Sequence, residues 1–336
     1  MVLYNNGCST YSGPFSRGGG HEMGWFIKRK RQPGWLALGL YQDRIDLVHV
    51  RRGADGAPAI AFCDSFRIEG SEALTLKRLR QAQKLDRYRC TTLLSTSHYQ
   101  LHQVDAPAVP LGEIKAAVRW RMKDIIDYPV ESATIEVLHI PGDPAAPGRE
   151  HGLYAVTARS VAIAACVRPF EDSQVALEAV DIPDLAQRNV AALFENDGGA
   201  AMLAVYETES LLTFTRHGEL LLSRRIDVGL PQLRIDNAER RAQTIEHVVL
   251  EVQRSLDNFE YQFPDVAVSK LLLAPLPRDT GLAARLTSNL AIPVEAIDFA
   301  SVMDLAAAPD LAHAEGQSQY LPLIGAALRG EEAAAA

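Results

Sequence analysis

Both halves of this chain begin with the same run of three short strands, and this repetition restricts the fold more than any other feature. Alternation of apolar and polar positions at Ile45, Leu47 and His49 is typical of a half-buried strand. The strands are predicted at 35–50 (two strands and a turn near Gln42-Asp43) and 59–68, and again at 201–206, 211–215 and 219–226. The repeated pattern predicts an internally duplicated α/β fold.

A further β/α unit interrupts the first half. Its opening segment is stiffened by Pro107 and Pro110, and a helix is predicted next from Leu111 to Asp127. The spacing of Ile114, Val118, Met122 and Ile125 predicts that they share the inner face of this helix. Strands at 134–140, 153–158 and 176–180 and a helix at 161–172 complete it. We expect a first lobe at 35–198 that contains an inserted subdomain at 106–180, a second lobe at 199–330, and tails at 1–34 and 331–336. Three strands followed by a helix, with Ser71 as its N-cap, resemble the opening of an actin-like (ribonuclease-H-like) half.

Composition excludes several classes of protein. The chain has 336 residues, 47% of them hydrophobic, which is enough for a sizeable core, so wholesale disorder is excluded. A formal net charge of −8 argues against a nucleic-acid binder that relies on a broad positive field. No apolar run approaches the ~20 residues of a membrane-spanning helix. The four cysteines form no CxxC pair and are expected to be reduced thiols of a cytoplasmic protein.

The N-terminal segment differs from the body of the chain. Residues 1–22 are rich in Gly, Ser, Asn and Tyr and lack the features of a signal peptide, so we expect a disordered tail, with Met23 as a candidate natural start. After Met23, two aromatic residues precede a basic run that could touch an anionic membrane surface weakly. These residues are Trp25, Phe26, Lys28, Arg29, Lys30 and Arg31. The alternative is a solvated tail.

Local motifs for catalysis and metal binding are absent. The sequence has no GxxxxGK[ST], GxGxxG, HExxH or GxSxG, so no catalytic residue is assigned. His98 and His102 would share one side of a strand, but a third ligand is missing and ordinary strand histidines explain them. His247 belongs to a charged helix face. Asp43, Asp46 and Asp181 lie near predicted strand ends, yet nothing in the sequence makes them a metal-binding set.

A family resemblance covers residues 35–329. The segment at 99–140 has an extended stretch ending at Pro110, then Glu113-Ile114 opening a helix, then Tyr128-Pro129. Similar features continue at 154–159, 180–182 and 251–256, and in Tyr320-Leu-Pro-Leu-Ile-Gly-Ala-Ala-Leu-Arg329. Together these motifs resemble PilM-type pilus-assembly proteins. Within that superfamily, Trp120 and the Lys123–Ile126 segment resemble most the MshI group of mannose-sensitive haemagglutinin (MSHA) pilus systems.

The resemblance implies an actin-like fold whose cleft between the lobes can bind ATP, but the nucleotide loops depart from the family pattern. The first phosphate loop should read Gly-x-Asp-Ile-Gly, and this chain has Gly39-Leu-Tyr-Gln-Asp43. The second should read Asp-Ile-Gly, and the chain has Val205-Tyr-Glu207. Pro275 stands in the place of an adenosine-side Gly-Gly, and only Gly229 keeps its expected type. Since proline lacks the backbone donor and bulky side chains fill the space, we expect neither ATP hydrolysis nor ATP binding, and no other cofactor.

The family also implies a partner. A PilM-like protein docks the short cytoplasmic N-terminal tail of a single-pass, PilN-like membrane protein, which places it at the cytoplasmic face of the inner membrane. In that family the peptide lies between the first lobe and the inserted subdomain. Trp120, Ile126 and Tyr128 are our candidates for its pockets, because Trp120 projects from a polar helix face. The alternative is that Trp120 packs on the neighbouring subdomain.

Two functions of different class therefore stay open. The first is a scaffold of pilus assembly without enzymatic activity, which could also self-associate. The second is a nucleotide-dependent switch or ATPase with an unusual cleft.

Overall fold

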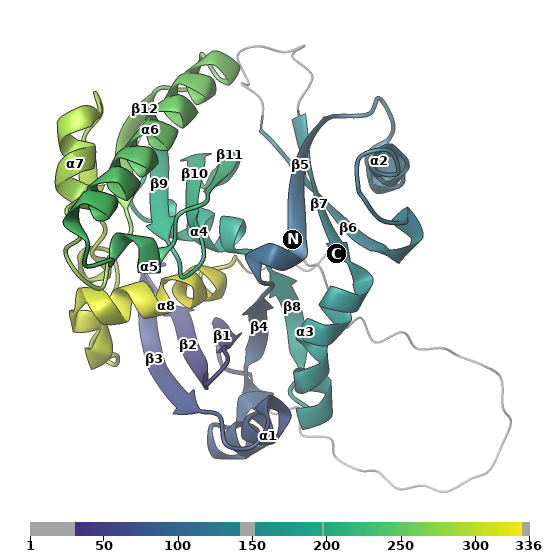
Figure 1. The fold of residues 1–336 in the computed structure, drawn as a ribbon. Coiled ribbons are helices and arrows are strands. Elements are labelled where there is room, and N and C mark those ends of the chain that lie inside the picture. The colour runs from purple at the N-terminus through teal and green to yellow at the C-terminus, as the bar shows by residue number, and fades with distance from the viewer. Residues whose placement is uncertain (1–30, 142–151, 197, 331–336) are drawn as a thin grey trace, which may run out of the picture.

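Two five-stranded sheets with the same strand order form the frame of the molecule. The structure is a computed structural model, and it describes residues 31–141, 152–196 and 198–330. The first sheet has the order β3-β2-β1-β4-β8 and the second the order β11-β10-β9-β12-β13 (Figure 1). In each sheet the three strands that come first in the chain pair antiparallel with one another. The fourth strand then pairs parallel with the first (β4 with β1, β12 with β9), and the fifth pairs parallel with the fourth. This repetition confirms the duplicated α/β fold.

The strands of the first sheet are β1 (Trp35–Leu40), β2 (Arg44–Arg52), β3 (Pro58–Arg67), β4 (Arg89–Leu93) and β8 (Leu177–Asp181). Those of the second are β9 (Gly199–Val205), β10 (Ser210–Arg216), β11 (Glu219–Ile226), β12 (Val268–Leu273) and β13 (Val294–Ala296). The helices are α1 (Glu72–Ala82), α2 (Ile114–Met122), α3 (Ser160–Ser173), α4 (Pro183–Ala191), α5 (Leu230–Leu233), α6 (Ala238–Gln262), α7 (Leu282–Asn289) and α8 (Ala314–Ala327). Ser71 caps α1 as expected: its hydroxyl accepts from the backbone N–H of Leu74.

The inserted subdomain is a three-stranded antiparallel sheet with one helix. Its strands β5 (Tyr99–Asp105), β6 (Ala133–His139) and β7 (Gly152–Arg159) have the order β5-β7-β6. One face packs on α2 through a separate core that includes Val118 and Met122. Its bounds differ from the expected 106–180, because β5 already belongs to this sheet and β8 pairs with β4 of the first lobe.

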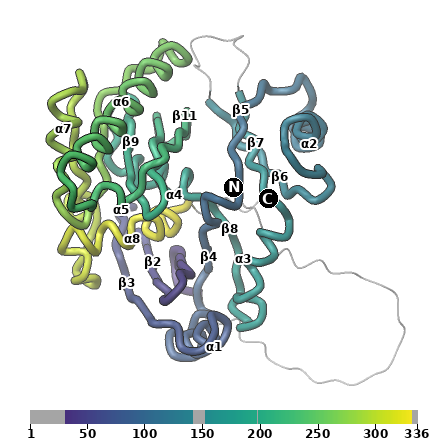
Figure 2. The backbone as a smooth tube through the Cα atoms, in the orientation of Figure 1, coloured from purple at the N-terminus to yellow at the C-terminus, as the bar shows by residue number. Residues whose placement is uncertain are grey.

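Each lobe ends in a helix that packs on the other lobe's sheet. Helix α4, from the end of the first half, packs on β9, β10 and β11, and α8, from the end of the second half, packs on β1, β2 and β4. The two helices cross each other between the sheets (Figure 2). One hydrophobic core accordingly contains residues of both lobes, such as Ala37, Ala186 and Leu323.

The crossing is tight because α8 has a glycine where it meets α4. A Cβ at Gly325 would overlap the backbone carbonyl of Ala186. The Asn189 side chain of α4 donates to the carbonyl oxygen of Gly325 at 2.9 Å. Just after the C-terminal end of α8, Arg329 pairs with Asp181 at 3.3 Å, and both side chains are buried. The guanidinium groups of Arg89 and Arg329 lie 4.0 and 4.6 Å from the ring centroid of Trp35.

Residues at the N-terminal end of the described chain contact the first lobe. Gln32 donates its backbone N–H to the carbonyl of Arg87 at 2.7 Å, and the ring of His49 donates to the carbonyl of Pro33 at 2.9 Å. Residues 31–34, which the sequence assigns to the tail, are thus bonded to the folded body. The expectations for 1–30 and 331–336 lie outside the described residues.

We predict that Gly325→Ala lowers the free energy of unfolding by about 1–3 kcal/mol, because the added methyl group must separate α4 from α8. Urea unfolding followed by circular dichroism measures the change. Gly112→Ala is the matched control, since a Cβ there meets no atom within 4 Å. Equal unfolding midpoints for Gly325→Ala and the unaltered protein would contradict the importance of this crossing.

Candidate functional site

The turn between β1 and β2, where the resemblance implies the first phosphate loop, is filled by a tyrosine. The ring of Tyr41 lies so close to Gly39 that a Cβ there would come within 2.8 Å of the ring. The guanidinium of Arg44 lies 4.6 Å from the centroid of the same ring. Burial, together with the nearby charge of Asp46, raises the pKa of Tyr41 to about 12. The space next to Gly39 is therefore taken by a side chain of the protein.

The turn between β9 and β10 is closed in a similar way. The hydroxyl of Tyr206 donates to Oε1 of Gln187 at 3.2 Å, and Nε2 of Gln187 donates to the carbonyl of Met202 at 2.7 Å. Burial raises the pKa of Tyr206, and the charge of Asp184 contributes to the increase. Each of the two turns where a phosphate loop was expected thus contains a tyrosine, Tyr41 in the first lobe and Tyr206 in the second. The substituted loop residues were the sequence signal for both, whereas nothing in the sequence marked Gln187.

Gly229 has a packing role in this arrangement. A Cβ at Gly229 would overlap the carbonyl of Glu207, so only glycine permits this approach between the two segments. The next residue, Leu230, donates its backbone N–H to the carbonyl of Tyr206 at 2.8 Å. The family-like glycine is explained without a nucleotide.

The segment after β12 offers few backbone donors. Ala274 donates its N–H to the carbonyl of Leu203 at 2.8 Å, and Pro275 is buried and has no N–H. Leu276 packs against the main core. Of the three expected nucleotide loops, the first two are therefore filled by Tyr41 and Tyr206, and the third has few backbone donors free for a ligand.

The three candidate partner-binding residues lie in different environments. Trp120 is 75% exposed on the outer face of α2, with the Lys123 ammonium 5.7 Å from its ring centroid, so it does not pack on a neighbouring subdomain. Ile126 is only 8% exposed and belongs to the core beneath α2, so we do not retain it as a candidate partner contact. After Met122 the backbone bonds become irregular, and Ile125, expected on the inner face, is 47% exposed instead.

Tyr128 lies at the junction of the inserted subdomain and the first lobe. It is half-buried, and the Arg159 guanidinium covers its ring 4.1 Å from the centroid. Arg159 ends β7 and immediately precedes α3, which packs on α1 of the first lobe. Tyr128 and Arg159 therefore form a platform between the two parts, which we call the junction platform.

The acidic residues considered for a metal site are each bonded to other side chains of the protein. Asp46 is buried in β2 and accepts from Ser65 at 2.6 Å and from Gln319 at 3.0 Å. Asp181 pairs with Arg329, and Asp43 is exposed beside Arg44. Among the described residues, no three His, Cys, Asp or Glu side chains are arranged to hold a metal ion.

The histidines are not brought together. His98 ends a short 3-10 turn before β5, and His102 lies within β5, where burial lowers its pKa. His247 is exposed on α6, and its neighbour Glu246 bonds Arg285. We therefore interpret these histidines as ordinary structural or surface residues and not as metal ligands.

Membrane contact through the N-terminal aromatic and basic residues lies mostly outside the described residues. This holds for Trp25, Phe26, Lys28, Arg29 and Lys30. Arg31 is described, and its guanidinium pairs with Glu178 at 2.5 Å. In the part of the chain that the structure describes, no helix is both long and apolar enough to span a bilayer.

Comparison with solved structures identifies the fold. The chain is similar to one from a PilM–PilN type IV pilus biogenesis complex, at 19% identity and a TM-score of 0.67, over 88% of this chain and 96% of that one. A Bacteroides thetaiotaomicron protein with an actin-like ATPase fold matches at 9% identity and a TM-score of 0.47, over 84% and 96% of the two chains. The cytoplasmic domain of Vibrio cholerae EpsL, from the type II secretion system, matches at 16% identity and a TM-score of 0.43, over 73% of this chain and 83% of that one.

No protein-family model and no curated protein matches the sequence. The structural likeness agrees with the strand order of the two sheets: this protein has the duplicated, two-lobed actin-like fold with an inserted subdomain in its first lobe.

We predict that Mg-ATP does not bind with a dissociation constant below ~1 mM, equivalent to about 4 kcal/mol, because Tyr41, Tyr206 and Pro275 occupy its loops. Isothermal titration calorimetry with the full chain measures this. Tighter binding would contradict the account of the closed loops.

Proposed function

We propose that this protein is an actin-like scaffold of a type IV pilus assembly complex, in the manner of PilM and of the MSHA-type MshI proteins. The observation that supports this most is the extent of the likeness. It spans both lobes and the inserted subdomain and covers 96% of a chain from the PilM–PilN complex. The proposed place of work is the cytoplasmic face of the inner membrane, where a partner's membrane anchor holds the protein.

The proposed scaffold works without a nucleotide and has no enzymatic activity. The filled loops at Tyr41 and Tyr206 support this, because side chains of the protein take the space next to Gly39 and bond Gln187. They disfavour the alternative of an ATP-dependent switch or ATPase. The lobes are instead joined by the protein's own helices α4 and α8.

The proposed partner is a single-pass, PilN-like membrane protein, and its cytoplasmic N-terminal peptide is the part that docks. We place the peptide between the first lobe and the inserted subdomain, on the junction platform of Tyr128 and Arg159. An aromatic ring with a cation above it offers an apolar surface and hydrogen-bond donors to an extended chain. Trp120 lies on the outer face of α2 and is the candidate for a second contact with the partner.

We predict that a synthetic peptide of the partner's N-terminal residues binds the full chain, and that Tyr128→Ala weakens it at least tenfold, about 1.4 kcal/mol. Fluorescence anisotropy of the labelled peptide measures the affinity. Trp120→Ala, in a separate arm, tests the outer contact. Tyr261→Ala is the matched control, since Tyr261 is 87% exposed on α6 in the second lobe. Failure of the unaltered protein to bind the peptide would contradict the proposed function.

A further inference from the structure

Asp184 is a buried carboxylate that joins three parts of the molecule. It lies in the first turn of α4 and is 1% exposed. Its Oδ1 accepts from the Ser223 hydroxyl of β11, in the second lobe, at 2.6 Å. Its Oδ2 accepts from the hydroxyl of Tyr99, the first residue of β5 in the inserted subdomain. One side chain of the helix between the lobes therefore bonds the subdomain and the second lobe at once.

A buried carboxylate is costly unless its charge is compensated. Both oxygens of Asp184 have hydroxyl donors, and its position in the first turn of α4 adds a favourable helix dipole. Burial raises the pKa of Tyr99, and the Asp184 charge raises it further, so the tyrosine keeps its proton and donates to the carboxylate. Loss of either hydroxyl leaves a buried carboxylate oxygen with one donor fewer.

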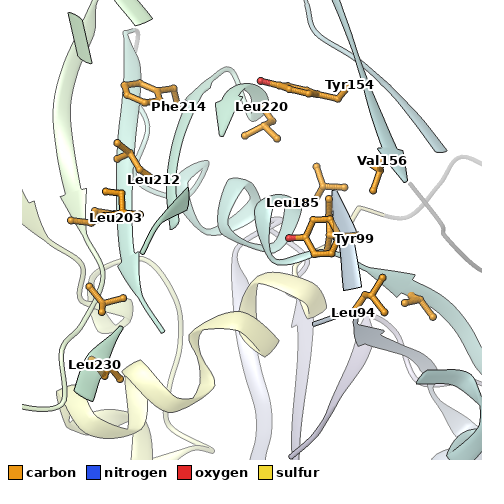
Figure 3. Close-up of a cluster of buried hydrophobic side chains, with 14 of the residues drawn as sticks. Leu94, Tyr99, Tyr154, Val156, Leu185, Leu203, Leu212, Phe214, Leu220 and Leu230 are labelled. Carbon is orange, nitrogen blue, oxygen red and sulfur yellow. The ribbon is translucent and has the colours of Figure 1, made fainter. Parts of the chain in front are cut away.

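Further contacts join the same two parts beside Asp184. The hydroxyl of Tyr154 in β7 donates to the carbonyl of Leu221 in β11 at 3.0 Å. The Arg225 guanidinium of β11 lies 4.7 Å from the ring centroid of Tyr99 and donates to the carbonyl of Thr96 at 2.6 Å. Figure 3 shows the rings of Tyr99 and Tyr154 projecting from the inserted subdomain toward α4 and β11. We call Asp184, Tyr99 and Ser223 the latch.

The latch lies next to the junction platform in the sheet. Tyr99 of β5 is paired with Ala158 of β7, and the next residue of β7 is Arg159, which covers Tyr128. Tyr154, which bonds the second lobe, is in the same strand β7. A movement of β5 and β7 relative to β11 must therefore move Arg159 as well.

We propose that the Asp184 latch holds the inserted subdomain against the second lobe and thereby sets the geometry of the junction platform at Tyr128 and Arg159. The part that concerns the platform as a peptide site rests on the proposed function. With the latch closed, the platform is preorganised and the peptide binds at its full affinity. With the latch open, the subdomain separates from β11 and the affinity falls.

The test uses the full chain and the variants Tyr99→Phe, Ser223→Ala and their combination. Tyr99→Phe removes the hydroxyl and keeps the ring beneath Arg225. Ser65→Ala is the matched control, because Ser65 donates to buried Asp46 at the same distance, 2.6 Å, but within the first lobe. Hydrogen exchange by mass spectrometry reports opening of the latch, and fluorescence anisotropy reports peptide affinity.

We expect amide exchange in β5 and β11 to rise about tenfold or more in each latch variant. Peptide affinity should fall about threefold or more, and Ser65→Ala should change neither quantity in these segments. Unchanged exchange in β5 and β11, or an equal rise in β9 and β12, overturns the latch. Raised exchange in β5 and β11 with unchanged peptide affinity overturns its link to the platform. If the unaltered protein binds no peptide, the proposed function fails, and the exchange data still decide the latch.

Discussion

The crossing of α4 and α8 is the contact on which the arrangement of the two lobes depends. Each helix comes from the end of one half and packs on the sheet of the other, so neither lobe completes its core alone. Gly325 lets the backbones touch, and Asn189 bonds across the contact. Two residues after α8, Arg329 pairs with Asp181 and so attaches the end of the described chain to the first sheet. The lobes are thus held by covalently attached helices.

This constraint supports the proposal that the actin-like fold works here without a nucleotide. A nucleotide in such a cleft would contact both lobes, and here the hydrogen bond between Gln187 of α4 and Tyr206 of the second lobe supplies a contact of that kind from the protein itself. The departures from the family pattern at the three loops are consistent with one another if the two lobes do not depend on a bound nucleotide. A fixed pair of lobes then serves as a frame against which the inserted subdomain is positioned through α4 and β11.

Much of the fold could be predicted from the sequence because local patterns determine it. Periodicity predicts the strand runs and the inner face of α2 at Ile114, Val118 and Met122. The preference of serine for the N-cap position predicts the cap at Ser71. The sequence motifs at 180–182 and 320–329, which seemed unrelated, meet as the Asp181–Arg329 pair. The sequence-based predictions failed where tertiary contacts decide the environment of a residue. Ile126 was misplaced because α2 ends irregularly after Met122. Asp184 was missed because a first-turn acid is ordinary in sequence, and its importance comes from residues 85 and 39 positions away.

The central claim is that the two lobes keep one arrangement without a nucleotide. The most direct measurement is the distance distribution between spin labels introduced as unnatural amino acids at Lys77 in α1 and Tyr261 in α6, with and without Mg-ATP. The account predicts one narrow distribution that is the same in both conditions. A broad distribution that narrows or shifts when Mg-ATP is added would contradict it.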